Sequence, residues 1–129
     1  MVDSVAVIRR LFEAFYSADE TAIREVIGPE FVTHAPGGGT GNAEGWISMA
    51  KQMSAALPDN VTEINDIFAS GDRVTVRYSC TGTQTGDLFG VPASNRQLVT
   101  GGIEIYRFDG ERVVECWGQY DMSQLFAQQ

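Results

Sequence analysis

The sequence has very little of the residue types that bind metal ions. Histidine occurs once, at His34, and cysteine twice, at Cys80 and Cys116. A single histidine excludes a histidine-rich metal centre and argues against a zinc site. The two cysteines lie in strand-like runs and do not form a Cys-x-x-Cys pair. We therefore expect no metal ion, and we expect reduced, buried thiols in a cytosolic protein.

Basic residues are also scarce, because 9 Lys and Arg stand against 17 Asp and Glu and give a net charge of −8. An acidic surface repels phosphate groups, and the chain has no cluster of Lys and Arg. Neither nucleic acid nor an anionic membrane is therefore an expected partner. No apolar run approaches the roughly 20 residues of a membrane span. The first residues also lack the basic region and apolar block of a signal peptide, so a cytoplasmic location is predicted.

The chain does have enough apolar residues for one well-packed domain. It has 129 residues, of which 43% are hydrophobic, and this combination supports a core at this size. There is no internal repeat, linker or low-complexity segment. We expect a single domain over residues 1–129.

The first half of the chain has the apolar spacing of helices. Apolar residues recur every three or four positions after Asp3 or Ser4, again after Asp19, and again between Asn42 and Pro58. These polar residues are of the types that cap helix N-termini. The sequence therefore predicts three helices.

After Pro58 the apolar spacing changes to every second residue, which is typical of strands. Long strands are predicted over residues 61–70, 73–84, 98–108 and 111–121, and a short extended segment over 30–36. Helices followed by strands in one small domain predict an α+β fold, in which the helices pack on one face of a curved antiparallel sheet.

The stretch 113–121, VVECWGQYD, has the most informative pattern. It is an alternating strand that ends on Asp121 and precedes a short helical segment. Asp121 is either a cap for that segment or a functional carboxylate in apolar surroundings. In unbroken alternation Trp117, Gln119 and Asp121 share one face of the sheet. A bulge at Gly118 would move them to the other face.

A bent sheet under helices leaves room for a small-molecule pocket, and polar residues in apolar surroundings are candidates to line it. Arg77 could equally face solvent, and His34 could close the loop before Pro36. The helical aromatic residues could equally be core. The predicted site residues are four polar and three apolar side chains: His34, Arg77, Gln119, Asp121, Phe15, Met53 and Trp117.

Four stretches follow one another along the chain: AFYSAD, EFVTHAP, GDRVTVRYSCTGTQTGDLFGVPAS and GGIEIYRFDGERVVECWGQYD. In this order they resemble the SnoaL-like polyketide cyclase family of the nuclear-transport-factor-like (NTF2-like) α+β cone superfamily. Together they cover nearly the whole chain. The resemblance implies a cone with an internal cavity and a small homo-oligomeric enzyme, often dimeric, without a cofactor. Such an enzyme closes a ring of an apolar polyketide by intramolecular aldol condensation.

The resemblance also implies roles for particular residues. In characterised members a single Asp on the last strand is the acid/base, and Asp121 matches its place. His34 matches a frequent histidine, and Phe15 matches a position that lines the substrate cavity. The residue before the tryptophan is often histidine in relatives and is Cys116 here.

An aldol cyclisation needs a base, a donor for the developing oxyanion, and a cavity that folds the substrate. Asp121 is the predicted base, and Gln119, His34 and Arg77 are the predicted oxygen-binding residues. The alternatives are other chemistry on the same fold, or no chemistry at all. Residues 107–109 have the Arg-x-Asp spacing of an epoxide hydrolase but lead into a turn. Tyr16 fits a steroid-isomerase-like site. A ligand-binding module or a dimerising scaffold would need neither the Arg-x-Asp stretch nor Tyr16 for chemistry.

Overall fold

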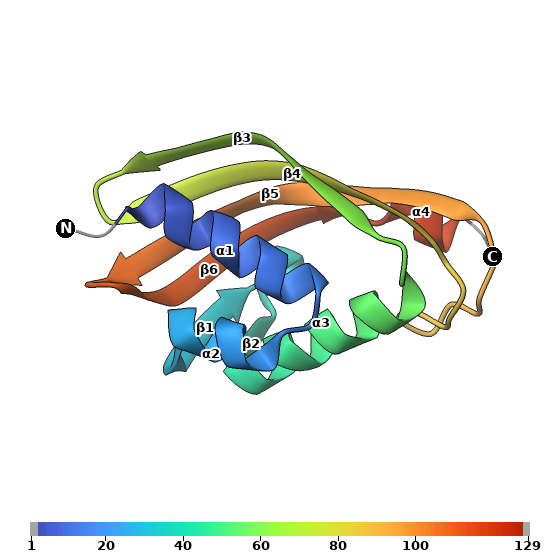
Figure 1. Cartoon of the computed structure of the whole chain (residues 1–129), viewed down its shortest axis with the longest axis horizontal. Helices are drawn as coiled ribbons and strands as arrows, with labels where there is room; N and C mark the ends of the chain where they lie inside the picture. The colour runs from blue at the N-terminus through green and yellow to red at the C-terminus, as the bar shows by residue number, and fades with distance from the viewer. Residues whose placement is uncertain (1–2, 128–129) are drawn as a thin grey trace.

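The computed structural model describes residues 3–127 and shows helices first and long strands later (Figure 1). The helices are α1 (Ser4–Tyr16), α2 (Glu20–Val26), α3 (Ala43–Ala56) and α4 (Ser123–Phe126), with a 3-10 turn η1 (Pro36–Gly38). The strands are β1 (Ile27–His34), β2 (Thr40–Asn42), β3 (Val61–Ser70), β4 (Arg73–Thr83), β5 (Gln97–Asp109) and β6 (Arg112–Asp121).

Helices α1, α2 and α3 begin at the predicted caps. The side chains of Asp3, Asp19 and Asn42 each accept a hydrogen bond from the backbone N–H three residues further on. These bonds satisfy amides that have no partner inside the helix. Among residues 3–127, no helix has the length and apolarity needed to cross a membrane.

The six strands form one sheet in the order β2-β1-β6-β5-β4-β3. All neighbours are antiparallel except β1 and β6, which run parallel. The prediction of a wholly antiparallel sheet is corrected here, because α3 and the long hairpins intervene between β1 and β6 and allow parallel pairing. The short strand β2 is formed by the end of a glycine-rich segment and pairs with β1.

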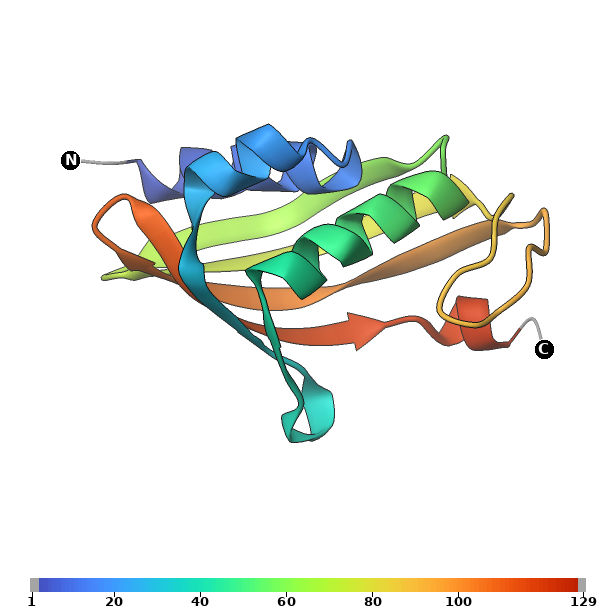
Figure 2. The same ribbon diagram turned by 90° about the horizontal axis from the view of Figure 1, so that it is seen from below.

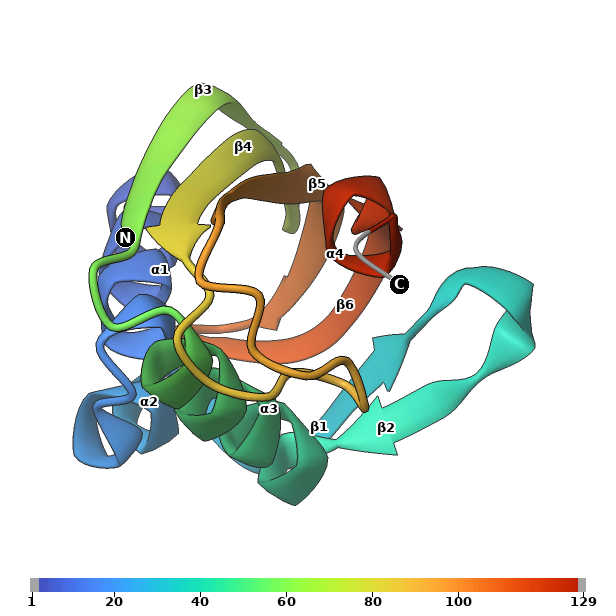
Figure 3. The same cartoon turned by 90° about the vertical axis from the view of Figure 1, so that its right-hand side faces the viewer.

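The helices cover one face of the sheet, and strands β3 to β6 curl around that side (Figures 2 and 3). The core lies between these two layers. Its helical side includes Leu11, Phe15 and Trp46, and its sheet side includes Val76 and Tyr106. The predicted α+β fold with helices on the concave face of a curved sheet is confirmed.

The register of β5 and β6 decides which residues face the helices. Pairing runs without a shift from Gly101 opposite Asp121 to Arg107 opposite Glu115. No bulge therefore lies at Gly118, and the alternation is unbroken there. Residues with even numbers on this part of β6 face the helices, and Asp121 and the other odd-numbered residues lie on the outer face.

Candidate active site

A cavity of about 120 Å³ lies between the helices and the inner face of the sheet. Its walls are aromatic and sulfur-containing side chains, with one carboxyl group, Glu104. Phe89 and Tyr120 are exposed members of the lining and mark the mouth. The lining residues are Phe12, Phe15, Tyr16, Trp46, Met49, Met53, Tyr78, Phe89, Thr100, Gly101, Glu104, Tyr106, Tyr120 and Met122.

Glu104 is the chemical centre of this cavity. Its exposed fraction is only 5%. The Tyr106 hydroxyl donates to Oε1 at 2.9 Å, and the Tyr120 hydroxyl donates to Oε2 at 3.0 Å. The Cys116 thiol lies 3.7 Å from Oε2. A buried carboxyl without such partners would be strongly destabilising.

Burial raises the pKa of Glu104, and the hydrogen bonds from Tyr106, Tyr120 and Cys116 oppose that rise. Desolvation disfavours the charged form, whereas donated hydrogen bonds stabilise it. The pKa of Glu104 is therefore raised, which makes its carboxylate a stronger base than an exposed one.

Two further phenol groups complete the polar end of the cavity. Burial and the nearby Cys80 and Glu104 raise the pKa of Tyr16. Burial and the negative charge of Glu104 likewise raise the pKa of Tyr78, whose ring centroid lies 6.4 Å from that of Tyr16. Both phenols stay protonated in the physiological range, so both are proton donors. Apart from these groups, Thr100 and the tyrosines that bind Glu104, the lining is apolar.

Strand alternation explains how these residues come together. On the inner face of β5 and β6, Tyr106 pairs with Cys116, Glu104 with Gly118, and Gly102 with Tyr120. On the other side of β5, Tyr78 of β4 lies opposite Gly102. The polar groups are thus direct or diagonal neighbours on one face, at the spacing where cross-strand side chains meet.

Two of the predicted site residues lie in the cavity wall. Phe15 of α1 and Met53 of α3 both line the cavity. The Phe15 ring packs against Trp46 in a tilted arrangement, with ring centroids 4.7 Å apart. The helical stripes thus pack the core and form the apolar wall of the cavity at the same time.

Asp121 lies outside the cavity lining. It is exposed at the end of β6, and its carboxylate accepts hydrogen bonds from the Ser123 amide at 3.0 Å and from the Ser123 hydroxyl at 2.6 Å. These bonds lower the pKa of Asp121. The apolar surroundings expected for a functional Asp121 are therefore contradicted. Its carboxylate instead binds Ser123, the first residue of α4, although the N-cap position of that helix is Met122 and no side chain caps it.

His34 and Trp117 lie together on the outer face of the sheet. The imidazole Nε2 is 2.7 Å from Oε2 of Glu115, and Arg107 donates to the other oxygen of the same carboxylate at 2.9 Å. The His34 ring stacks on Trp117 at 5.3 Å between centroids, and the guanidinium of Arg73 lies 4.8 Å from the Trp117 ring centre. The predicted role of His34 and Trp117 in the cavity is corrected, because the alternation carries both outward.

Arg77 and Gln119 share this outer face and are exposed. Arg77 donates from Nε to Asp66 at 2.7 Å, in an exposed ion pair. Neither residue lines the cavity, so the predicted oxygen-binding role is corrected for both. The Arg-x-Asp stretch 107–109 also lies away from the cavity, with Arg107 on the outer face. Within residues 3–127 no three His, Cys, Asp or Glu side chains are grouped so that they could hold a metal ion.

Sequence reasoning missed Glu104 as a site residue. Its signal was the one acidic residue inside GGIEIYRF, between two isoleucines and in alternation with Tyr106 and Phe108. A lone Glu on the face of a strand that also carries large aromatic residues is a candidate for a buried carboxyl.

Comparison with known proteins identifies the family. The profile of the SnoaL-like polyketide cyclase family matches residues 6–129. The chain belongs to the SnoaL-like polyketide cyclase family. Among solved structures, this member is similar to IdmH from Streptomyces antibioticus, described as "a putative polyketide cyclase". The two chains are 31% identical with a TM-score of 0.85, and the match covers 98% of each.

Two more distant structures share the fold of this SnoaL-like chain. AclR from Streptomyces galilaeus, described as "a putative hydroxylase", is 24% identical with a TM-score of 0.85, over 95% of this chain and 92% of its own. An NTF2-like protein from Burkholderia pseudomallei is 16% identical with a TM-score of 0.75, over 99% and 98%. No curated protein gave a significant match to the chain. The fold is NTF2-like.

Proposed function

We propose that this chain is a cofactor-independent enzyme that rearranges an apolar, polyketide-like substrate by acid–base catalysis from Glu104. The observation that carries the proposal is a fully buried carboxyl group, held by two tyrosine hydroxyls, in a cavity that is otherwise mostly apolar. Membership of the SnoaL-like family supports the substrate class. The role first assigned to Asp121 passes to Glu104, because only Glu104 lies where a ligand would contact it.

The proposed reaction is an intramolecular aldol-type ring closure. The Glu104 carboxylate removes a proton from a carbon flanked by carbonyl groups, and the resulting enolate carbon attacks a ketone carbon of the same molecule. The alkoxide that forms takes the proton back from Glu104. No atom is gained or lost, and the carboxylate is regenerated. A raised pKa makes Glu104 a stronger base once it has ionised.

Tyr16 and Tyr78 are the proposed donors to the enolate oxygen. Both line the cavity, and both hold their protons at neutral pH. A preorganised hydroxyl in a water-poor cavity stabilises developing negative charge more strongly than bulk water does. The apolar walls at Phe15 and Met53 would hold the substrate chain folded, so that the two carbon atoms meet.

The proton-removal step can be tested without the natural substrate. We would measure by NMR the deuterium uptake at the activated CH₂ of an aromatic β-keto methyl ester in D₂O, with and without protein. The wild-type protein should accelerate uptake above the buffer rate. Glu104→Gln should lose at least about 10²-fold of that acceleration, whereas Asp121→Asn should keep it.

Two results would contradict the proposal. If Glu104→Gln exchanges the proton as fast as the wild type, Glu104 is not the base. If the wild-type protein binds the ester, seen as protection of the protein against thermal unfolding, yet gives no exchange above buffer, the chain is a ligand-binding module instead.

A further inference from the structure

Two glycines leave the inner face of β5 and β6 open beside Glu104. Gly118 lies directly opposite Glu104, and Gly102 lies directly opposite Tyr120. A Cβ atom built on Gly118 would overlap the ring and hydroxyl of Tyr120. Glycine inside a strand weakens it unless another group needs the space. Here the space that a side chain at 118 would fill is taken by Tyr120.

The Tyr120 ring therefore lies back along its own strand, over Gly118. From this position its hydroxyl reaches diagonally across to Oε2 of Glu104 at 3.0 Å. A cross-strand diagonal is within reach of an aromatic side chain. The hydrogen bond to Glu104 thus depends on the absence of a side chain at Gly118.

Tyr120 also differs from the other hydrogen-bonding partners of Glu104 in its exposure. Tyr106 and Cys116 are 1% and 0% exposed, whereas Tyr120 is 40% exposed. Tyr120 therefore stands between Glu104 and solvent. The cavity, at about 120 Å³, is smaller than the roughly 300–1,000 Å³ of typical small-molecule sites. A larger ligand must move side chains at the mouth, where Tyr120 lies.

We infer that Tyr120, seated on Gly118, is the positioning residue of this site. Its hydroxyl orients the Glu104 carboxyl, its ring covers that carboxyl from solvent, and a ligand reaches Glu104 by moving it. The inference rests on the proposed function where it treats Glu104 as the acid/base. The ionisable groups that face Glu104 come from α1, β4, β5 and β6: Tyr16, Tyr78, Tyr106, Cys116 and Tyr120. The residues of α3 at the cavity, Trp46, Met49 and Met53, do not ionise.

The test is a pH titration of Glu104 in the ligand-free protein, followed by NMR of ¹³C-labelled glutamate carboxyls and assigned with Glu104→Gln. Tyr120→Phe removes one donor to the carboxylate and should raise the pKa of Glu104. Gly118→Ala should displace the Tyr120 ring from its position over residue 118 and should also raise the pKa of Glu104. The double variant should show no further rise, because the hydrogen bond can be lost only once.

Tyr106→Phe is the matched control. It removes the other tyrosine donor and should also raise the pKa of Glu104, but its effect should add to that of Gly118→Ala. Additive shifts for Gly118→Ala and Tyr120→Phe, or no shift for either, would overturn the inference. If Gly118→Ala does not fold, the pair Gly118→Ala with Tyr120→Ala should fold, because the smaller side chain frees the space. If this double variant does not fold either, the inference that Tyr120 occupies the space over Gly118 is contradicted.

The titration uses no substrate, so its outcome is separate from that of the exchange assay. If the hydrogen bond from Tyr120 to Glu104 is lost and deuterium uptake by the ester stays intact, only the positioning role of Tyr120 is refuted. An intact positioning role without exchange would refute the proposed chemistry alone.

Discussion

At the scale of single residues, two carboxyl groups on neighbouring strands have opposite environments. Glu104 is enclosed by phenols and its pKa is raised, whereas Asp121 is exposed beside Ser123 and its pKa is lowered. Neither the residue type nor the place in a strand explains why the two carboxyl groups differ in environment. The face of the sheet explains the difference, because one face is buried under helices and the other is open.

The buried carboxyl should make stability fall with rising pH. The pKa of Glu104 is raised by burial above the ordinary value of 4.5, so its contribution to stability is complete below that value. The contribution is lost as the pH rises through the raised pKa of the folded state. Glu104→Gln lacks this ionisation. Thermal unfolding from pH 4 to 9 should show the wild type losing more stability than the variant, and parallel curves would contradict the prediction.

Asp121→Asn should affect stability weakly and chemistry not at all. The hydrogen bonds from Ser123 lower the pKa of Asp121, so its contribution is present above the ordinary pKa and disappears as the pH falls through the lowered one. A small drop in melting temperature is expected at pH 7 and none near pH 2. Proton exchange with the β-keto ester should remain at the wild-type rate. A large loss of exchange would return the catalytic role to Asp121.

The sequence was informative about the cavity wall but not about its polar end. Phe15 and Met53 could be placed because helical spacing leaves one apolar stripe, and that stripe must face the core. Strand alternation gives two faces and does not say which is inner. Ile103, Ile105 and Trp117 make the outer face apolar as well. Hydrophobicity alone therefore could not separate the face of Asp121 from the face of Glu104.

At the scale of elements, the loop from β4 to β5 is organised by one buried amide. Gln84 is fully buried, and its Nε2 donates to the carbonyls of Val91 and Pro92, both at 3.1 Å. Its Oε1 accepts from the Ser94 hydroxyl at 2.9 Å. This anchor holds the turn that carries Phe89, whose φ of 49° lies in the left-handed region, at the cavity mouth.

Gln84→Ala should therefore destabilise the protein by about 2–4 kcal/mol, since it removes the side-chain hydrogen bonds to Val91, Pro92 and Ser94 and opens a small cavity. Urea unfolding measures the change. Gln52→Ala on the exposed face of α3 is the matched control, because its amide donates an exposed hydrogen bond to Ser48, and it should cost less than about 0.5 kcal/mol. Equal costs for the two variants would show that the buried amide does not hold the loop.

The elements themselves could be predicted more fully than their pairing. The helix caps, the four long strands and the Asp109-Gly110 turn follow from local chemistry, because each depends on neighbouring residues. The parallel pairing of β1 with β6 joins segments about 80 residues apart, and no local signal encodes it. Gly28 and Pro29, residue types that commonly follow the end of a helix, instead lie inside β1.

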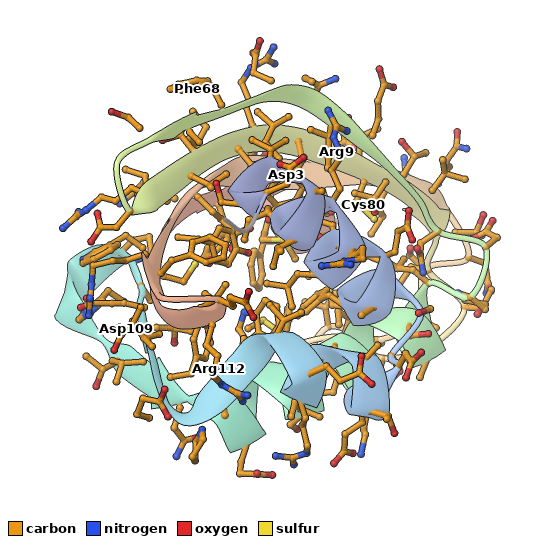
Figure 4. The ribbon with its side chains drawn as sticks, turned by 60° about the vertical axis from the view of Figure 1, so that its left-hand side comes forward. Asp3, Arg9, Phe68, Cys80, Asp109 and Arg112 are labelled. Carbon is orange, nitrogen blue, oxygen red and sulfur yellow. The ribbon has the colours of Figure 1, made fainter. Side chains whose placement is uncertain are left out.

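At the scale of the whole molecule, the outer face of the sheet remains open. One row of paired residues crosses it from Phe68 through Thr75 and Ile105 to Trp117. Phe68 projects away from the body of the protein (Figure 4), and Ile103 beside this row is 48% exposed. Exposed apolar residues grouped on one face are typical of an interaction surface.

The homo-oligomer that the family resemblance implies stays a prediction, and this face is where we expect a second copy to pack. Light scattering after size-exclusion chromatography should then give twice the 14.1 kDa of one chain. Ile103→Asp should return the mass to that of one chain, because a charge would be buried without a partner. Phe126→Asp, at a residue of similar exposure on α4, is the control and should leave the mass unchanged.

The salt dependence of dimerisation distinguishes an apolar interface from an interface held by ion pairs. Each chain carries a net charge of −8, so two copies repel each other at long range while their apolar faces attract at contact. Added salt screens the repulsion, since the Debye length falls from about 30 Å at 0.01 M to about 10 Å at 0.1 M. Dimerisation should therefore strengthen between these two salt concentrations. A dimer that weakens with salt would depend on ion pairs, and the apolar outer face would not be its interface.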